Sequence, residues 1–173
     1  MTDEAKSIDA ILGEEFLTWL WYQSDTAPSA FRDKNGLPFN LYMEQSIVVQ
    51  GGDGDARETA TVSGSLSPLR EARFGLGTGK KVTRALIRLE KDDLIFQLTL
   101  KAEDFSIGGL KTPKLDSTDK DDDPDALFLE KIFLMETAMD LLDWVFLGFL
   151  NLRLSPKWVE EVNEMGKWLS QTE

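Results

Sequence analysis

The feature that most constrains the fold is a pair of alternating runs at residues 82–89 and 94–101, separated by a four-residue turn. Successive side chains of a strand point to opposite faces. One face of the two runs is apolar throughout, with Ala85, Ile87, Leu89, Leu94, Phe96, Leu98 and Leu100. The other face carries Arg84, Arg88, Gln97, Thr99 and Lys101. The sequence therefore predicts an antiparallel hairpin that packs its apolar face on a core and exposes its polar face.

The other patterns complete a single α+β domain of 173 residues, in which an antiparallel sheet of two hairpins packs with an N-terminal helix and two C-terminal helices. Helical periodicity predicts the first helix at 8–23. Strands at 41–50 and 57–62, around the glycine-rich segment 51–55, predict the second hairpin, so the strands fall within about 41–101. Helices are expected at 124–153 and 156–170, and Ser155 and Pro156 suit the N-cap and first turn of the last helix.

An acidic segment at 116–125 is predicted to be an exposed linker that leads into the most apolar part of the chain. Five charged residues interrupt that apolar helix: Glu130, Lys131, Glu136, Asp140 and Asp143. Ionised side chains are too costly within the hydrocarbon core of a bilayer. We therefore expect this helix to be buried in the protein, and we expect no membrane partner. The N-terminus is acidic and no apolar signal core follows it, which predicts a cytoplasmic protein.

Histidine and cysteine are both absent. Histidine is the usual general base near neutral pH, and both residue types are common metal ligands. Their absence excludes Ser-His-Asp and Cys-His centres as well as disulfide bonds. We therefore predict a non-catalytic protein that needs no cofactor and acts by binding.

The formal net charge of −12 opposes binding to nucleic acid, because affinity for phosphates comes largely from lysine and arginine. Residues 70–91 depart from this balance, with seven basic residues against two acidic ones. Arg84 and Arg88 project from the same strand face about 13 Å apart, and Lys101 can lie alongside. This basic face either contacts phosphates without reading sequence or is an edge protected by charge and paired with carboxylates.

Two loop-like patterns resemble ligand sites in composition. Asp119, Asp121, Asp123 and Glu130 have the spacing of a calcium-binding loop, but Pro124 stands where that loop needs glycine, so a solvated lead-in to the helix is the simpler interpretation. The glycine-rich segment 75–81 lacks the spacing GxxxxGK[ST] and is predicted to be a turn before a strand.

A third acidic pattern lies within the long helix. Glu136, Asp140 and Asp143 share one helical face, where they either support acid–base and metal chemistry or simply face water. Glu14 and Glu15 are expected to face water on the first helix.

The hairpin segment Gly79-Lys-Lys-Val-Thr-Arg-Ala-Leu-Ile-Arg-Leu-Glu-Lys-Asp-Asp-Leu-Ile-Phe-Gln-Leu-Thr-Leu, followed by Leu110-Lys111, resembles the later half of RdgC, the bacterial recombination-associated protein. Upstream, Gly13-Glu-Glu-Phe-Leu-Thr-Trp-Leu-Trp-Tyr22 is similar to longer RdgC-like relatives, so the likeness covers residues 13–154. It implies a nucleoid-associated, ring-shaped homodimer that binds double-stranded DNA with little sequence preference and restrains the RecA recombinase. Some members of the family also carry an exonuclease label. The chain departs from the family in its acidic charge and in lacking a counterpart of the N-terminal half.

These observations leave three hypotheses. The first is an RdgC-like accessory protein in DNA recombination or nucleoid maintenance, with Lys80, Lys81, Arg84, Arg88 and Lys101 as candidate backbone contacts and no catalytic residue. The second is a protein–protein interaction or homo-oligomerisation module built on the apolar helices at 16–22 and 127–154. The third is a metal-dependent nuclease that uses Glu136, Asp140 and Asp143.

Overall fold

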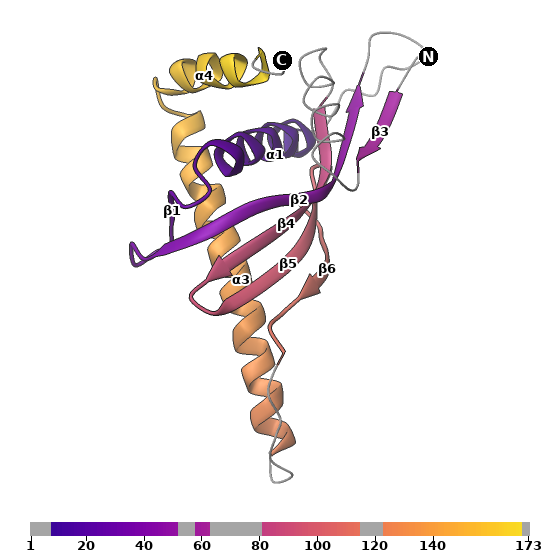
Figure 1. Cartoon of the computed structure of the whole chain (residues 1–173), viewed down its shortest axis with the longest axis vertical. Helices are drawn as coiled ribbons and strands as arrows, with labels where there is room; N and C mark the ends of the chain where they lie inside the picture. Colours follow the sequence, from indigo (N-terminus) through magenta and orange to yellow (C-terminus); the bar gives the residue numbers. More distant parts are fainter. Residues whose placement is uncertain (1–7, 52–57, 63–80, 115–122, 171–173) are drawn as a thin grey trace.

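The computed structural model describes residues 8–51, 58–62, 81–114 and 123–170 (Figure 1). The elements in chain order are α1 (Ile8–Thr26), β1 (Phe31–Arg32), β2 (Pro38–Gly51), β3 (Glu58–Val62), β4 (Lys81–Lys91), β5 (Leu94–Lys101), β6 (Ile107–Lys111), α3 (Pro124–Arg153) and α4 (Trp158–Ser170). An antiparallel sheet, preceded in the chain by one helix and followed by two, confirms the predicted α+β class.

The sheet has the strand order β1-β2-β4-β5-β6, and β3 pairs with the end of β2. Both predicted hairpins are present, because β2 pairs with β3 and β4 pairs with β5 in antiparallel ladders. The sequence did not indicate β1 and β6. β1 has two residues, and β6 contains Gly108 and Gly109, so neither has the alternating pattern that identifies a strand.

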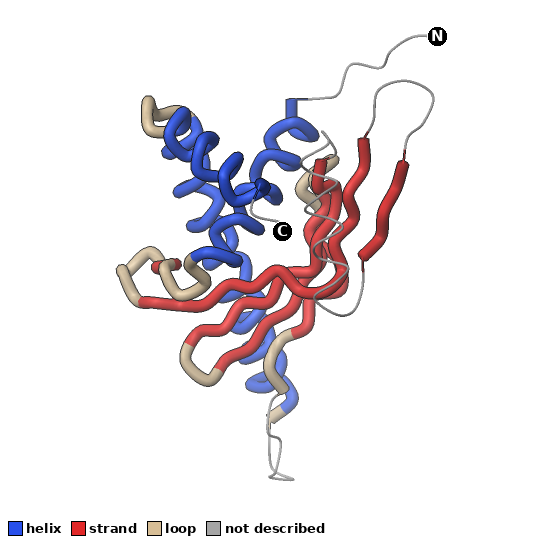
Figure 2. Tube along the Cα trace, turned by 45° about the horizontal axis from the view of Figure 1, so that its top comes forward, coloured by secondary structure: helices blue, strands red, loops and turns tan. Residues whose placement is uncertain are grey.

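The core lies between the apolar face of the sheet and the helices, which gather on one side of it (Figure 2). Ala85, Ile87 and Leu89 of β4 are fully buried there, as the alternation predicted. α1 packs against the sheet at Gly13, where an added Cβ would lie 2.1 Å from the carbonyl oxygen of Ala102. A side chain at that position would therefore hold α1 away from the end of β5.

Aromatic rings join the three helices. Phe16 of α1 has its ring centroid 5.3 Å from that of Phe149 in α3, and Phe149 lies 5.7 Å from Trp158 of α4. Trp21 of α1 meets Trp168 of α4 edge-to-face at 5.5 Å. These contacts bury the wide apolar arc of α1 against two other helices as well as the sheet.

Helix α3 has the predicted bounds, but the expectation that it is buried is wrong. Its buried residues share one side: Leu134, Ala138, Leu141, Leu142, Val145 and Phe149. Its first turns extend past the sheet (Figure 1). Large apolar side chains on its other sides are exposed. Within the part of the chain that the structure describes, no helix has the length and hydropathy of a membrane span.

Two local expectations are also corrected. α4 begins at Trp158, and the Ser155 hydroxyl donates to the carbonyl oxygen of Leu152 instead of capping α4. Glu14 is buried, with 8 % of its surface exposed, although it was expected to face water. Most sides of α1 contact other elements, and Glu14 lies on one of these sides. Glu15 accepts a hydrogen bond from Nε of Arg153 at 2.7 Å, which ties α1 to the end of α3.

Several sequence predictions lie outside the described residues. These are the calcium-loop carboxylates Asp119 and Asp121, most of the acidic linker, the glycine-rich turn up to Lys80, and Lys80 itself. Asp123 is described, and its carboxylate accepts from the backbone N–H of Asp125 at the N-cap of α3.

Candidate functional site

The most prominent surface feature is a line of exposed residues along α3, which we call the outer stripe: Leu129, Phe133, Glu136, Asp140, Trp144 and Leu147. They follow one another every three or four residues and so lie on one side of the helix. The exposed fractions are 65 % for Leu129, 62 % for Phe133, 44 % for Trp144 and 49 % for Leu147. Together the four apolar residues expose on the order of 400 Å², which is within the range of the largest apolar patch on a typical monomer, a feature that is often functional.

The centre of the outer stripe is acidic. Glu136 and Asp140 separate the apolar pair at its start from the pair at its end, and Asp143 lies beside them. Asp140 forms an ion pair of 3.7 Å with Lys34 in the β1–β2 turn, but both side chains are more than half exposed. Such a pair contributes little and is easily replaced.

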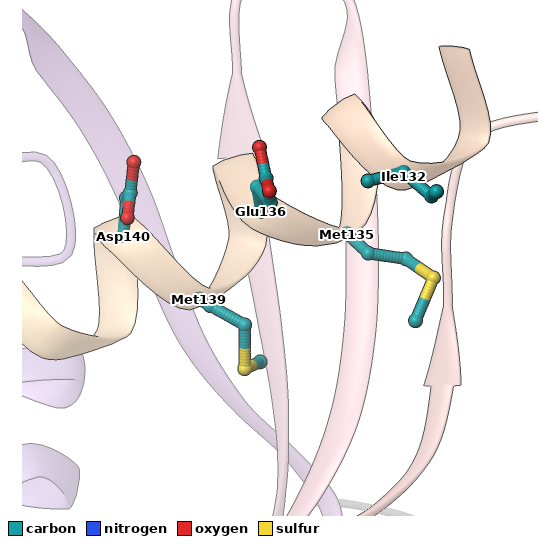
Figure 3. Close-up of a pocket in the computed structure, with 5 residues that line it drawn as sticks. All are labelled: Ile132, Met135, Glu136, Met139 and Asp140. Carbon is teal, nitrogen blue, oxygen red and sulfur yellow. The ribbon is translucent and has the colours of Figure 1, made fainter. Parts of the chain in front are cut away.

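The side of α3 next to the outer stripe is lined by methionine. Figure 3 shows Met135 and Met139 pointing away from Glu136 and Asp140 on the same helix. With Ile132 these residues border a shallow hollow of about 440 Å³. All the lining residues come from one helix, so this is an open depression along α3. Methionine adapts its shape readily to a partner surface.

The basic hairpin face is largely as the alternation predicted, but its arginines differ in their contacts. Arg88 is held by two carboxylates: it donates to Glu90, and its Nη1 lies 3.5 Å from Oε1 of Glu44. Its guanidinium also lies 5.9 Å from the ring centre of Tyr42. A phosphate would have to displace these carboxylates to reach Arg88.

Arg84 and Lys101 lie farther along the same face, and we call them the basic pair. They are direct cross-strand partners in the β4–β5 ladder, and both are exposed. Neither forms an ion pair with the described residues. Lys81 is exposed at the start of β4, opposite Gln50.

The carboxylates proposed for a nuclease all face solvent. Glu136, Asp140 and Asp143 are exposed on α3. Across residues 8–51, 58–62, 81–114 and 123–170, no group of three metal-binding side chains converges. The described part of the chain thus offers these residues as a charged surface.

No protein-family model, curated protein or solved structure matches this chain. The resemblance to RdgC therefore stays a prediction. A function can therefore be inferred only from the geometry of the helices and of the basic hairpin.

Proposed function

We propose that the protein is an interaction module whose outer stripe binds a helical segment of a partner protein. The observation that carries this proposal is the exposure of four large apolar side chains on one side of α3. A helix that is apolar on several sides is normally covered. A partner helix, which presents side chains at the same spacing, fits such a surface.

The partner segment should be basic. Carboxylates occupy the centre of the stripe, and six of the eight charged residues at 123–153 of the chain are acidic. A second copy in antiparallel contact through the stripe would place Glu136 and Asp140 against the same carboxylates, and two chains of net charge −12 also repel at long range. A partner with lysine or arginine at its centre, flanked by apolar residues, matches both parts of the stripe.

Fluorescence anisotropy tests the proposal with two labelled helix-forming peptides. Both carry leucines spaced to meet Phe133 and Trp144, which lie about 16 Å apart along the helix axis. One has three central lysines, and the other has three central glutamates. We expect the lysine peptide to bind about tenfold more tightly, since three exposed charge pairs contribute roughly 0.5 kcal/mol each. Raising the salt concentration should narrow this difference.

A matched pair of variants shows whether the stripe is the binding surface. Phe133→Ser should abolish peptide binding, whereas Val159→Ser, at an equally exposed apolar residue of α4, should leave it unchanged. Equal effects of the two variants, or no binding of either peptide, would contradict the proposal. A dimer in light scattering that Phe133→Ser dissociates would instead show that a second copy covers the stripe.

A second candidate function follows from the basic pair. Arg84 and Lys101 supply two exposed cations on an open sheet face, in keeping with the RdgC-like hypothesis of sequence-independent DNA contact. A titration of duplex DNA at about 20 mM salt gives this contact its best chance, because counterion release is then most favourable. Binding that Arg84→Glu removes would support it, and no binding at this salt concentration would eliminate it.

A further inference from the structure

A cavity of about 210 Å³ lies beside the outer stripe, between α1, β1 and α3. Its walls include Trp19 and Gln23 from α1, Phe31 and Arg32 from β1, and Trp144 and Gly148 from α3. Trp144 belongs to both the cavity and the outer stripe, so the two surfaces are continuous. We call this feature the aromatic cavity.

Several polar atoms that line the aromatic cavity form hydrogen bonds within the domain. Trp19 Nε1 and Gln23 Nε2 both donate to Oε1 of Glu161, at 3.1 and 2.8 Å. Nη1 of Arg32 donates to the carbonyl oxygens of Ser29 and Phe31. Trp144 is 44 % exposed, whereas Trp19 and Phe31 are each 8 % exposed, so an occupant would gain apolar contact chiefly against Trp144.

The size of the cavity favours a single side chain. Pockets for whole small-molecule ligands begin at about 300 Å³, above the volume found here. A cavity that takes one large side chain next to an exposed apolar surface has the form of an anchor site in a protein interface.

Gly148 lines the aromatic cavity, so its lack of a side chain affects how closely a partner can approach. A glycine inside a helix costs stability relative to alanine, and no atom lies within 4 Å of the position that a Cβ would take there. The packing of the domain thus gives no reason for glycine, in contrast to Gly13. Gly166 of α4 is equally open but does not line the cavity, so it provides a matched control.

We propose that the aromatic cavity receives one large apolar side chain of the partner helix, and that Gly148 lets that helix approach closely. This inference rests on the proposed function, because the same partner covers the outer stripe. The side chain would enter between Trp19, Phe31 and Trp144, while the lysines of the partner face Glu136 and Asp140.

Gly148→Leu and Gly166→Leu test the inference with the lysine peptide. Leucine is a better helix former than glycine, so both variants should melt no lower than the original protein. Gly148→Leu adds a side chain at the wall of the cavity, where the partner helix would approach, and should weaken peptide binding about tenfold, whereas Gly166→Leu should not change it. Replacing the leucines of the peptide one at a time by alanine should identify one position whose loss no longer matters in Gly148→Leu.

Indole, a probe about the size of one aromatic side chain, reports on the cavity without the peptide. We expect indole to shift the side-chain NMR signals of Trp19 and Trp144, and to lose this effect in Gly148→Leu. Undiminished peptide binding by Gly148→Leu overturns the inference while leaving the proposed function intact. An indole response without any peptide binding overturns the proposed function and its partner helix, but supports the cavity as an apolar side-chain site.

Discussion

Arg84 of β4 lies directly opposite Lys101 of β5, so the sheet places two like charges in a cross-strand pair. Such pairs are destabilising, because their side chains are close neighbours on one face. Arg84→Glu should convert the repulsion into an ion pair and raise the free energy of unfolding by roughly 0.5–1 kcal/mol. Urea denaturation measures the change. Lys81→Glu, opposite the uncharged Gln50, is the control, and an equal gain in both variants would exclude the cross-strand explanation.

The β4–β5 hairpin shows what the sequence could establish. The alternation of apolar and polar residues correctly identified its core face, including Ile87 and Leu98. A strand that buries one face must alternate in this way. The same pattern placed Arg88 on the polar face with Glu90 two residues along the same strand, but its second carboxylate partner depends on tertiary structure. Glu44 comes from β2, and only the β2–β4 pairing brings it to Arg88.

The helices show where sequence patterns stop being informative. α3 is apolar on most sides, so periodicity gave its bounds but could not decide which sides the domain covers. The second hypothesis named the helix at 127–154 as an interface, but it could not say which side of the helix is exposed, and it also included residues 16–22, where Phe16, Leu17 and Leu20 are buried in the core. The aromatic cavity joins residues from three elements, and only Gly148, an isolated glycine in a helical pattern, was a signal in the sequence.

Gly13→Ala should be strongly destabilising. The new methyl group would lie 2.1 Å from the carbonyl oxygen of Ala102, so α1 must move away from the sheet. We expect a loss of about 3 kcal/mol in thermal or urea unfolding, at the upper end for overpacking. Gly166→Ala, where nothing lies nearby, should instead stabilise by about 0.5–1 kcal/mol. Similar effects of the two substitutions would show that the close approach at Gly13 is not maintained in solution.

Asp33 should make the stability sensitive to acid. A hydrogen bond from Lys91, and further ones from the backbone N–H groups of Leu37 and Asn35, lower the pKa of Asp33 below its ordinary value of 3.8. The carboxylate therefore stabilises the fold above pH 3.8, and this contribution is lost as the pH falls through the lower pKa of the folded state.

Asp33→Asn should be less stable than the original protein at neutral pH and should lose less stability on acidification below about pH 4. Urea midpoints across this pH range measure the difference. Asp93→Asn, at an exposed residue of the β4–β5 turn, provides the comparison. Parallel pH profiles for the original protein and Asp33→Asn would refute a stabilising role for the ionised carboxylate.

Trp168 should control whether α4 stays attached. It is 4 % exposed, packs edge-to-face on Trp21 and Tyr22, and donates from Nε1 to Oδ2 of Asp25 at 2.6 Å. Trp168→Ala removes these contacts. In a core that cannot rearrange, such a substitution lowers the free energy of unfolding by about 3–5 kcal/mol. α4 is the last described helix and can detach while the sheet stays folded, so the loss should appear as local opening.

Hydrogen exchange distinguishes local from global loss of stability in this variant. Amides of α4 should lose protection in Trp168→Ala, whereas those of β4 and β5 should keep theirs, because α1 and α3 still cover the sheet. Val162→Ala removes an apolar residue that is half exposed on the same helix and should leave both sets protected. Uniform loss of protection in α4 and the sheet would mean that Trp168 belongs to the cooperative core and that α4 does not open independently of the rest of the domain.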